Sequence, residues 1–171
     1  MMIIAQFAGE KISSVSEEAF SLFEKSVFGE KLKGKIEYSY VESLFLIEEG
    51  KMEIYFGNKK IDFEGLLRKL RKLDRKIEVK YVVFYDMRKK GYIVKTALKF
   101  GAEFRVYEKG VRPGEDHAKW ILYAVRGNET MNWHDFSAKN IVAHSTKKNL
   151  LIGIVDEEGD VIYYEVKWER P

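Results

Sequence analysis

The pattern of apolar and polar positions predicts both strands and helices in the first half of the chain. Residues 2–7 and 52–56 are short apolar runs typical of strands, and residues 35–40 alternate polar with apolar side chains, as a half-buried strand does. Residues 41–49, followed by Gly50, are expected to form a short helix. The first half is therefore predicted to combine helices with strands.

Two more helices in this half are indicated by capping residues. Ser14 with Glu17 three positions later fits a capping box, and the apolar residues that follow recur along one helical face up to Gly29. Asp62 is expected to cap a helix over residues 63–73. The polar side of that helix is basic: Arg68, Lys69, Arg71, Lys72, Arg75 and Lys76. We interpret these charges as a solvated face, with phosphate binding as the alternative, because no aromatic residues are interleaved with them to stack on bases.

The second half mixes the same two kinds of element without repeating the first. A helix ended by Gly91 begins near Glu78, where we place a domain boundary. The elements expected after it are strands over residues 92–97, 103–108 and 118–125, a helix over residues 134–145, and a hairpin of residues 150–155 and 161–168. This division gives an N-terminal domain of residues 1–77 and a C-terminal domain of residues 78–171.

The composition excludes several classes of function. The 171 residues include no cysteine, so disulfides, thiolate zinc sites and cysteine nucleophiles are ruled out. The longest apolar runs are far shorter than the roughly 18 residues that span a bilayer, and residues 1–8 lack the basic start of a signal peptide. We therefore expect a cytoplasmic protein that does not enter a membrane.

The charged residues add two weaker hypotheses. The formal net charge is +3, which permits an acidic partner such as nucleic acid without requiring one. Lysine and glutamate are abundant while Gln6 is the single glutamine, a bias that accompanies life at high temperature. A thermophilic source is the hypothesis, and a melting temperature below about 65 °C would contradict it.

The three histidines do not suggest a metal site. None of His117, His134 and His144 has the close spacing to a carboxylate and a second histidine that a metallohydrolase helix requires. His134 is expected near a helix start, and His144 is expected to be packed on the same helix. The sequence therefore predicts no metal and no cofactor.

His117 is a candidate catalytic residue because the predicted elements bring other reactive side chains near it. Tyr107 ends one strand, a turn with Gly110 and Pro113 leads to His117, and Lys148 stands between a helix and the next strand. Mixed sheets commonly carry their functional residues at such element ends. Three groups able to hold or move a proton are thus expected at these positions.

Groups of these kinds are sufficient to cleave RNA without a metal. The 2′-hydroxyl of the RNA is itself the nucleophile, so the protein must remove its proton, protonate the leaving 5′-oxygen and balance the charge of the phosphorane. Histidine suits the acid role because its unperturbed pKa of about 6.5 lies near neutral pH, and a lysine ammonium suits the charge balance. Tyrosine is a weak base unless a cation stabilises its phenolate, a role also open to Lys148.

Four short segments of the second half stand in a specific order and spacing. They read FRVYEKG at residues 104–110, PGEDHA at 113–118, AHSTKK at 143–148 and IVDEEGD at 154–160. In this order they resemble the archaeal tRNA-splicing endonucleases. The first half is more loosely similar to the N-terminal domain of that family, through Phe28-Gly29 and the run VESL at residues 41–44.

The resemblance implies a metal-independent endonuclease that cuts precursor tRNA at both borders of an intron, leaving 2′,3′-cyclic phosphate and 5′-hydroxyl ends. By that likeness the general base falls on Tyr107, the general acid on His117 and the stabiliser of the transition state on Lys148. Lys147 is then expected to be a phosphate contact or a surface residue, because side chains alternate along a strand. The implied fold is α+β, with an N-terminal domain of helices and antiparallel strands and a catalytic domain whose mixed central sheet is flanked by helices.

The resemblance also implies how the RNA is bound. The substrate carries a bulge-helix-bulge motif, which is read by its shape and its unstacked bases. Family members commonly have an arginine in the helix before the lysine, where it clamps a flipped base, whereas this chain reads KNIV at residues 139–142. Lys139, Arg112 or the indole of Trp168 is expected to replace that arginine.

Two cuts in one substrate require two active sites, which a symmetric assembly supplies. We expect a homotetramer, with a heterotetramer containing a second, non-catalytic chain as the alternative. The last hairpin resembles a loop that such enzymes insert into a basic cleft of a neighbouring subunit, and its acidic residues are Asp156, Glu157, Glu158 and Asp160. The other functional alternative is a non-catalytic RNA-binding or scaffold subunit, against which the presence of Tyr107, His117 and Lys148 argues.

Overall fold

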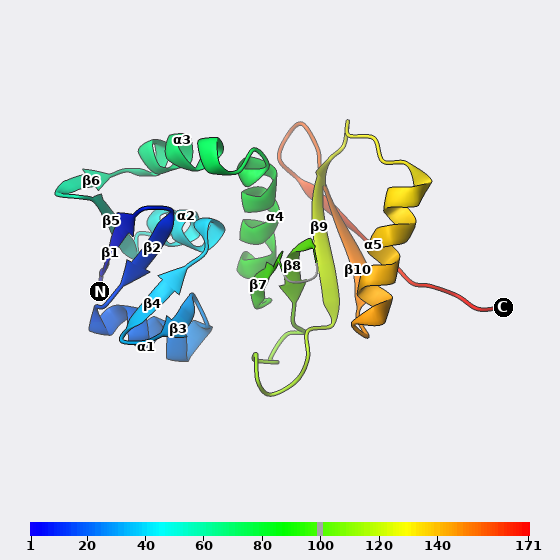
Figure 1. Ribbon diagram of the computed structural model, residues 1–171, viewed down its shortest axis with the longest axis horizontal. Coiled ribbons are helices and arrows are strands. Elements are labelled where there is room, and N and C mark those ends of the chain that lie inside the picture. The colour runs from blue at the N-terminus through cyan, green and yellow to red at the C-terminus, as the bar shows by residue number, and fades with distance from the viewer. Residues whose placement is uncertain (99–100) are drawn as a thin grey trace. The chain divides into compact units, whose positions relative to one another are not determined.

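The computed structural model describes residues 1–98 and 101–171, and the chain divides into two compact units, Met1–Tyr81 and Val82–Pro171. Each unit has its own β-sheet and its own helices, which confirms the α+β fold expected from the sequence (Figure 1). Among the described residues, no helix combines the length and the apolar character needed to span a bilayer.

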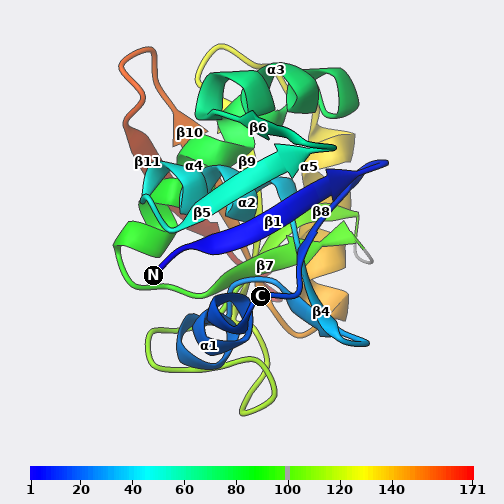
Figure 2. The ribbon, with the colours of Figure 1, turned by 90° about the vertical axis from the view of Figure 1, so that its left-hand side faces the viewer.

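The N-terminal unit contains a six-stranded sheet and three complete helices. Its strands are β1 (Ile3–Ala8), β2 (Lys11–Ser14), β3 (Glu30–Leu32), β4 (Lys35–Tyr38), β5 (Met52–Phe56) and β6 (Lys59–Ile61), and its helices are α1 (Glu17–Ser26), α2 (Tyr40–Glu48) and α3 (Phe63–Leu73). The strand order is β3-β4-β2-β1-β5-β6. The neighbouring strands β1 and β5 are parallel (Figure 2), and the other neighbouring pairs are antiparallel.

Helices α2 and α3 start where side chains cap the first turn. The carboxylate of Asp62 accepts a 2.8 Å hydrogen bond from the amide of Gly65 at the start of α3, as the sequence predicted. Ser39 and Glu42 form a reciprocal capping box at the start of α2. These caps satisfy amides that have no partner within the helix, and so they fix where each helix begins.

One cap was placed wrongly from the sequence, and three short strands were missed. The cap expected at Ser14 is wrong, because Ser14 lies in β2 and its hydroxyl donates a 2.6 Å hydrogen bond to the carbonyl of Ile4. Helix α1 is capped by Ser16 instead. The missed strands β2, β3 and β6 have three or four residues each, too few to show a period of two.

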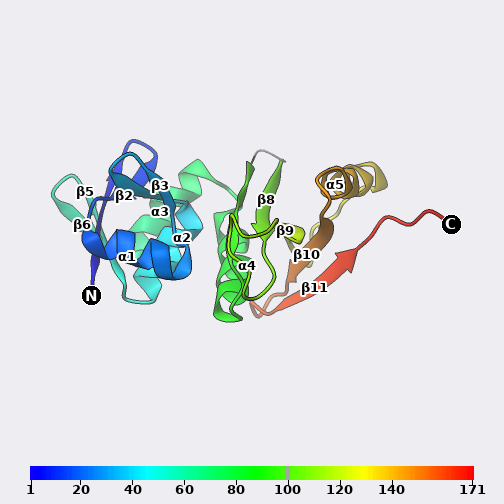
Figure 3. The same ribbon diagram turned by 90° about the horizontal axis from the view of Figure 1, so that it is seen from below.

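The C-terminal unit contains a five-stranded mixed sheet. Its strands are β7 (Val94–Ala97), β8 (Ala102–Val106), β9 (Trp120–Arg126), β10 (Asn149–Val155) and β11 (Val161–Val166), and its helices are α5 (Trp133–Ser145) and the greater part of α4 (Ile77–Lys89). The order is β11-β10-β9-β8-β7, with β9 and β10 parallel and the other pairs antiparallel. The expected hairpin is formed by β10 and β11 (Figure 3).

Helices α4 and α5 cover opposite faces of this sheet (Figure 1). On one face, Phe84 of α4 packs against Phe104 of β8, with 5.9 Å between the ring centroids. On the other face, Ala143 of α5 belongs to a buried cluster with Ile121 of β9 and Leu150 of β10. The sheet is therefore held from both sides, which confirms the mixed sheet flanked by helices and leaves the strand ends free to carry a site.

Candidate active site

Three neighbouring strands of the C-terminal sheet have an end at the same edge. Trp120, the first residue of β9, is paired with Val106, the last residue of β8, and with Asn149, the first residue of β10. Tyr107 directly follows β8 and Lys148 directly precedes β10. Because neighbouring strands lie about 4.8 Å apart, the main chains of Tyr107 and Lys148 are separated by two strand spacings, about 10 Å.

Tyr107 is held firmly at this edge. Its side chain is buried, and its amide donates a 3.0 Å hydrogen bond to the carbonyl of Ile93. Its hydroxyl accepts a 3.1 Å hydrogen bond from Nε of Arg105. The phenol oxygen therefore already faces a cation.

Lys148 is half-buried at the start of β10. Its amide donates to the carbonyl of Ala143 (2.8 Å), and its ammonium donates to the carbonyl of Thr146 (3.1 Å). Burial lowers the pKa of Lys148 below its ordinary value, and the positive charge of Arg105 lowers it further. Arg105 thus acts on both of the predicted site residues that flank β9.

Arg105 was missed in the sequence, although it stands two positions before Tyr107. Alternation along β8 places both side chains on the same face of the sheet. Its Nη1 donates to the carbonyl of Thr96, which anchors the guanidinium to β7. The alternation was readable from the sequence, but the pairing of β7 with β8 was not.

His117 comes from a different segment of the chain than Tyr107 and Lys148. It is exposed in the connection between β8 and β9, and its amide donates a 2.7 Å hydrogen bond to the side chain of Asp116. Within the described part of the chain, no hydrogen bond joins its imidazole to Tyr107 or Lys148. The connection begins and ends at the edge that carries Tyr107, so His117 belongs to the same end of the sheet.

The charges around Tyr107 are mainly cationic. Lys95 of β7 is paired opposite Arg105, and Lys148 lies across β9. Of the nearby carboxylates, Glu108 forms a 2.8 Å ion pair with Lys119. Such an edge favours a phosphate group. Over residues 1–98 and 101–171, no cluster of three or more carboxylate or imidazole side chains is arranged to hold a metal ion.

Lys147 and Lys148 have different surroundings. Lys147 is exposed and its backbone adopts a φ of +59° in the turn after α5. Lys148, in contrast, is half-buried beside the charge of Arg105. Lys148 is thus the more enclosed of the two lysines, and its choice as the catalytic lysine stays a prediction.

The side chains predicted to contact RNA come from three different segments. The ammonium of Lys139, on α5, lies 4.5 Å from the ring centroid of Tyr123. Arg112 is half-buried in the connection between β8 and β9, and its amide donates to the carboxylate of Glu115 (3.3 Å). Trp168 follows β11 and is 54% exposed.

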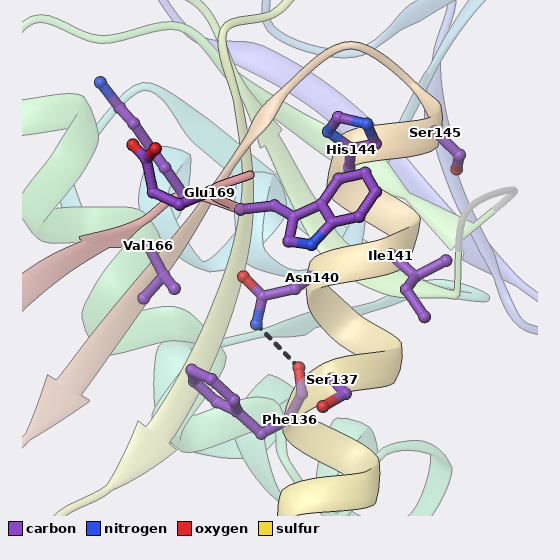
Figure 4. Close-up of a pocket in the computed structure, with 10 residues that line it drawn as sticks. Phe136, Ser137, Asn140, Ile141, His144, Ser145, Val166 and Glu169 are labelled. Atoms are coloured by element: carbon purple, nitrogen blue, oxygen red, sulfur yellow. Dashed lines mark hydrogen bonds between the residues drawn. The ribbon is translucent and has the colours of Figure 1, made fainter. Parts of the chain in front are cut away.

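A groove of about 490 Å³ runs between α5 and the segment after β11 (Figure 4). Asn140 and His144 of α5 line it together with Trp168. A smaller pocket of about 150 Å³ shares these residues and adds Lys148. This smaller pocket therefore brings Trp168 and Lys148 together.

The packed position expected for His144 is wrong. Its side chain is exposed, and its ring lies 4.2 Å from that of Trp168 in an edge-to-face contact. The neighbouring Ala143 takes the buried position, since successive residues of a helix point about 100° apart.

The acidic hairpin is ordered by one of its own carboxylates. Oδ1 of Asp156 accepts hydrogen bonds of 2.9 Å from the amides of Glu158 and Asp160, and Gly159 adopts a φ of +86°. The side chain of Glu157 is exposed at the tip. The turn therefore has an ordered main chain and presents its other carboxylates to solvent.

Comparison with known proteins finds matches over both units. The model of the tRNA intron endonuclease N-terminal domain matches residues 3–67, and the model of the tRNA intron endonuclease catalytic C-terminal domain matches residues 77–163. A protein named tRNA-splicing endonuclease from Thermococcus kodakarensis is 38% identical over 170 residues, which cover 99% of each chain. Proteins of the same name from Thermococcus onnurineus and Nanoarchaeum equitans are 38% and 40% identical, over 96% and 79% of this chain and 95% and 90% of their own lengths.

Proposed function

The chain belongs to the tRNA intron endonuclease family, and from that premise we propose that it excises introns from precursor tRNA by cutting bulge-helix-bulge sites. The products are a 2′,3′-cyclic phosphate and a 5′-hydroxyl. The observation that carries the proposal is that Tyr107 follows the end of β8 and Lys148 precedes the start of β10 at one edge of the sheet. Arg105 donates a hydrogen bond to Tyr107, and its charge lowers the pKa of Lys148.

Tyr107 serves as the general base and His117 as the general acid. The deprotonated phenol of Tyr107 takes the proton of the 2′-hydroxyl as the 2′-oxygen attacks the adjacent phosphorus. The bond from phosphorus to the 5′-oxygen breaks, and the imidazolium of His117 protonates the departing oxygen. Both side chains then exchange protons with solvent, which restores the starting state.

Lys148 stabilises the phosphorane that forms between these two proton transfers. An ammonium held by a main-chain carbonyl at the end of a strand is positioned before the reaction begins, so little reorganisation is needed when charge develops. Because a fixed cation supplies this stabilisation, the proposed reaction proceeds without a metal ion.

The RNA is held by cations and one aromatic ring around this edge. Arg112 and Lys147 are suited to phosphates, since Arg112 lies in the connection between β8 and β9 and Lys147 lies in the turn before β10. Lys139 and Trp168 are suited to an unstacked base, through charge and stacking respectively.

The proposed assembly is a homotetramer that presents two active sites to the two splice sites of one RNA. The acidic hairpin with Asp156, Glu157, Glu158 and Asp160 supplies an intersubunit contact, because its exposed carboxylates are complementary to a basic cleft. A heterotetramer with a second chain is the competing arrangement.

The test is to incubate the purified chain alone with a bulge-helix-bulge RNA in the presence of a chelator. We expect two cuts, with product ends that resist phosphatase until the cyclic phosphate is opened by acid. Binding without cleavage would indicate a non-catalytic subunit, and cleavage only after addition of magnesium would indicate a different mechanism.

A further inference from the structure

Arg105 is the residue that the proposed mechanism does not use, although it contacts the proposed base. Its guanidinium is fixed at two points, by Nη1 on the carbonyl of Thr96 and by Nε on the hydroxyl of Tyr107, 3.1 Å away. A planar guanidinium with two anchored arms has little rotational freedom. The hydrogen bond therefore fixes the position of the phenol oxygen as well as its surroundings.

The donor in this hydrogen bond carries a full positive charge. Such a bond strengthens when the acceptor oxygen becomes negative, so the contact stabilises charge on the phenol oxygen when its proton leaves. The other cations at this face are Lys95, opposite Arg105 on β7, and Lys148, beyond β9. Two carboxylates of this region have partners of their own, since Glu103 accepts a 2.9 Å hydrogen bond from the amide of Ala124 and Glu108 pairs with Lys119.

We propose that Arg105 is a positioning residue for proton abstraction, which holds the phenol oxygen of Tyr107 toward the 2′-hydroxyl and acts on the reaction through Tyr107. This inference rests on the proposed function, in which Tyr107 is the base. Loss of a charged hydrogen bond of this kind is expected to lower the cleavage rate roughly 10- to 100-fold.

A double-mutant cycle with Arg105→Gln and Tyr107→Phe tests the inference. Cleavage is measured under single-turnover conditions on a bulge-helix-bulge RNA whose scissile 5′-oxygen is replaced by sulfur. The thiolate leaves without a proton donor, so the rate of the Tyr107→Phe variant stays measurable. We expect Arg105→Gln to lower the rate roughly 10- to 100-fold in the native background and less than about twofold beside Tyr107→Phe, with RNA affinity unchanged in both.

Two further variants separate positioning from folding. Arg105→Lys keeps the charge but presents one point of attachment, and we expect it to recover part of the lost rate. Arg126→Gln makes the same substitution at the opposite end of β9, where the side chain is exposed, and should leave the rate unchanged. Melting temperatures of all variants are recorded alongside.

Each outcome leads to a different conclusion. An equal loss from Arg105→Gln in both backgrounds would show that Arg105 acts independently of Tyr107, and would overturn the inference. A loss from Tyr107→Phe with none from Arg105→Gln would overturn the inference and leave the proposed function intact. Full activity of Tyr107→Phe would instead remove Tyr107 as the base, and the proposed mechanism with it.

Discussion

The main-chain amide of Gly29 donates a 2.7 Å hydrogen bond to the carboxylate of Glu42, which is 4% exposed. The other carboxylate oxygen accepts from the amide and the hydroxyl of Ser39, at 3.0 and 2.8 Å. One buried acid thus ties the turn before β3 to the start of α2. This contact joins the Phe28-Gly29 and VESL runs, since Gly29 and Glu42 are 13 residues apart in the chain.

Glu42→Gln should destabilise the protein by about 2 kcal/mol, because the amide loses the charge that strengthens three hydrogen bonds and cannot accept with both of its ends. The free energy of unfolding is measured by urea denaturation. Glu24→Gln is the matched control, since its side chain is 67% exposed in a surface ion pair with Lys31, and the expected change is below about 0.5 kcal/mol. Equal effects from the two substitutions would contradict the role given to Glu42.

Tyr38→Phe should leave the stability unchanged or raise it by about 1 kcal/mol. The hydroxyl of Tyr38 is buried and, within the described part of the chain, has no hydrogen-bond partner. Burial, and then the charge of Glu42, raise the pKa of Tyr38, so the group stays a neutral phenol at ordinary pH. Tyr40→Phe is the control, because the hydroxyl of Tyr40 donates to the carbonyl of Glu10 at 2.8 Å. A clear loss of stability in Tyr38→Phe alone would show that its hydroxyl is satisfied.

The fold was predictable wherever a capping residue agreed with a long apolar period. Asp62 before the leucines of α3 is such a case, because both signals are local. Ser14 and Ser16 are equally good caps by sequence, and the choice between them is made by the carbonyl of Ile4 on the neighbouring strand. The three-residue strands β3 and β6 depend in the same way on partners distant in the chain.

The candidate site was also predictable only in part from the sequence. Tyr107, His117 and Lys148 were predicted as site residues from their places at element ends and from the family resemblance, and the strand register brings the first and last to one edge of the sheet. Arg105 could not be named, because an arginine on a strand is usually a solvated residue. Its proposed role depends on its hydrogen bonds to Tyr107 and to the carbonyl of Thr96 on β7, and the second partner is supplied only by the folded sheet.

His117→Gln should lower the cleavage rate by roughly 100- to 10,000-fold while leaving the affinity for RNA unchanged. The exposed imidazole is free to approach the departing oxygen, and glutamine cannot deliver a proton to it. On RNA with sulfur at the scissile 5′ position the loss should nearly vanish, because the thiolate needs no proton. Measuring single-turnover rates on both RNAs checks this, and an equal deficit on the two would remove His117 as the acid.

Reversing charge at the tip of the acidic hairpin should weaken self-association. Glu157→Lys with Glu158→Lys leaves the carboxylate of Asp156, and hence the turn, in place. If the hairpin docks in a basic cleft, the two like charges oppose docking and the assembly dissociates. Light scattering across a concentration series measures this, with Glu157→Gln and Glu158→Gln as the milder control. An unchanged assembly in the lysine variant would exclude the hairpin as an intersubunit contact.

Lys148→Met should lower the cleavage rate roughly 100- to 1,000-fold, because the variant lacks the charge that stabilises the transition state. The same substitution should change how the stability of the protein depends on pH. Burial and the charge of Arg105 lower the pKa of Lys148, so the ammonium is disfavoured in the folded chain. Below the lowered pKa this penalty is fully present. Above about 10.4, the value for an unfolded lysine, both states are neutral and the penalty is gone.

The native chain should therefore gain stability relative to Lys148→Met as the pH rises from 7 toward 10. The sign follows from proton binding, because the unfolded chain holds more protons than the folded chain in that interval. Melting temperatures at a series of pH values measure the difference. Lys147→Met is the matched control for the loss of a lysine side chain, since this exposed neighbour has the same chain length. If the stability advantage of the native chain over Lys148→Met instead falls as the pH rises, the folded chain stabilises the ammonium. Lys148 would then be positioned by attraction to a carboxylate and not by main-chain contact beside Arg105.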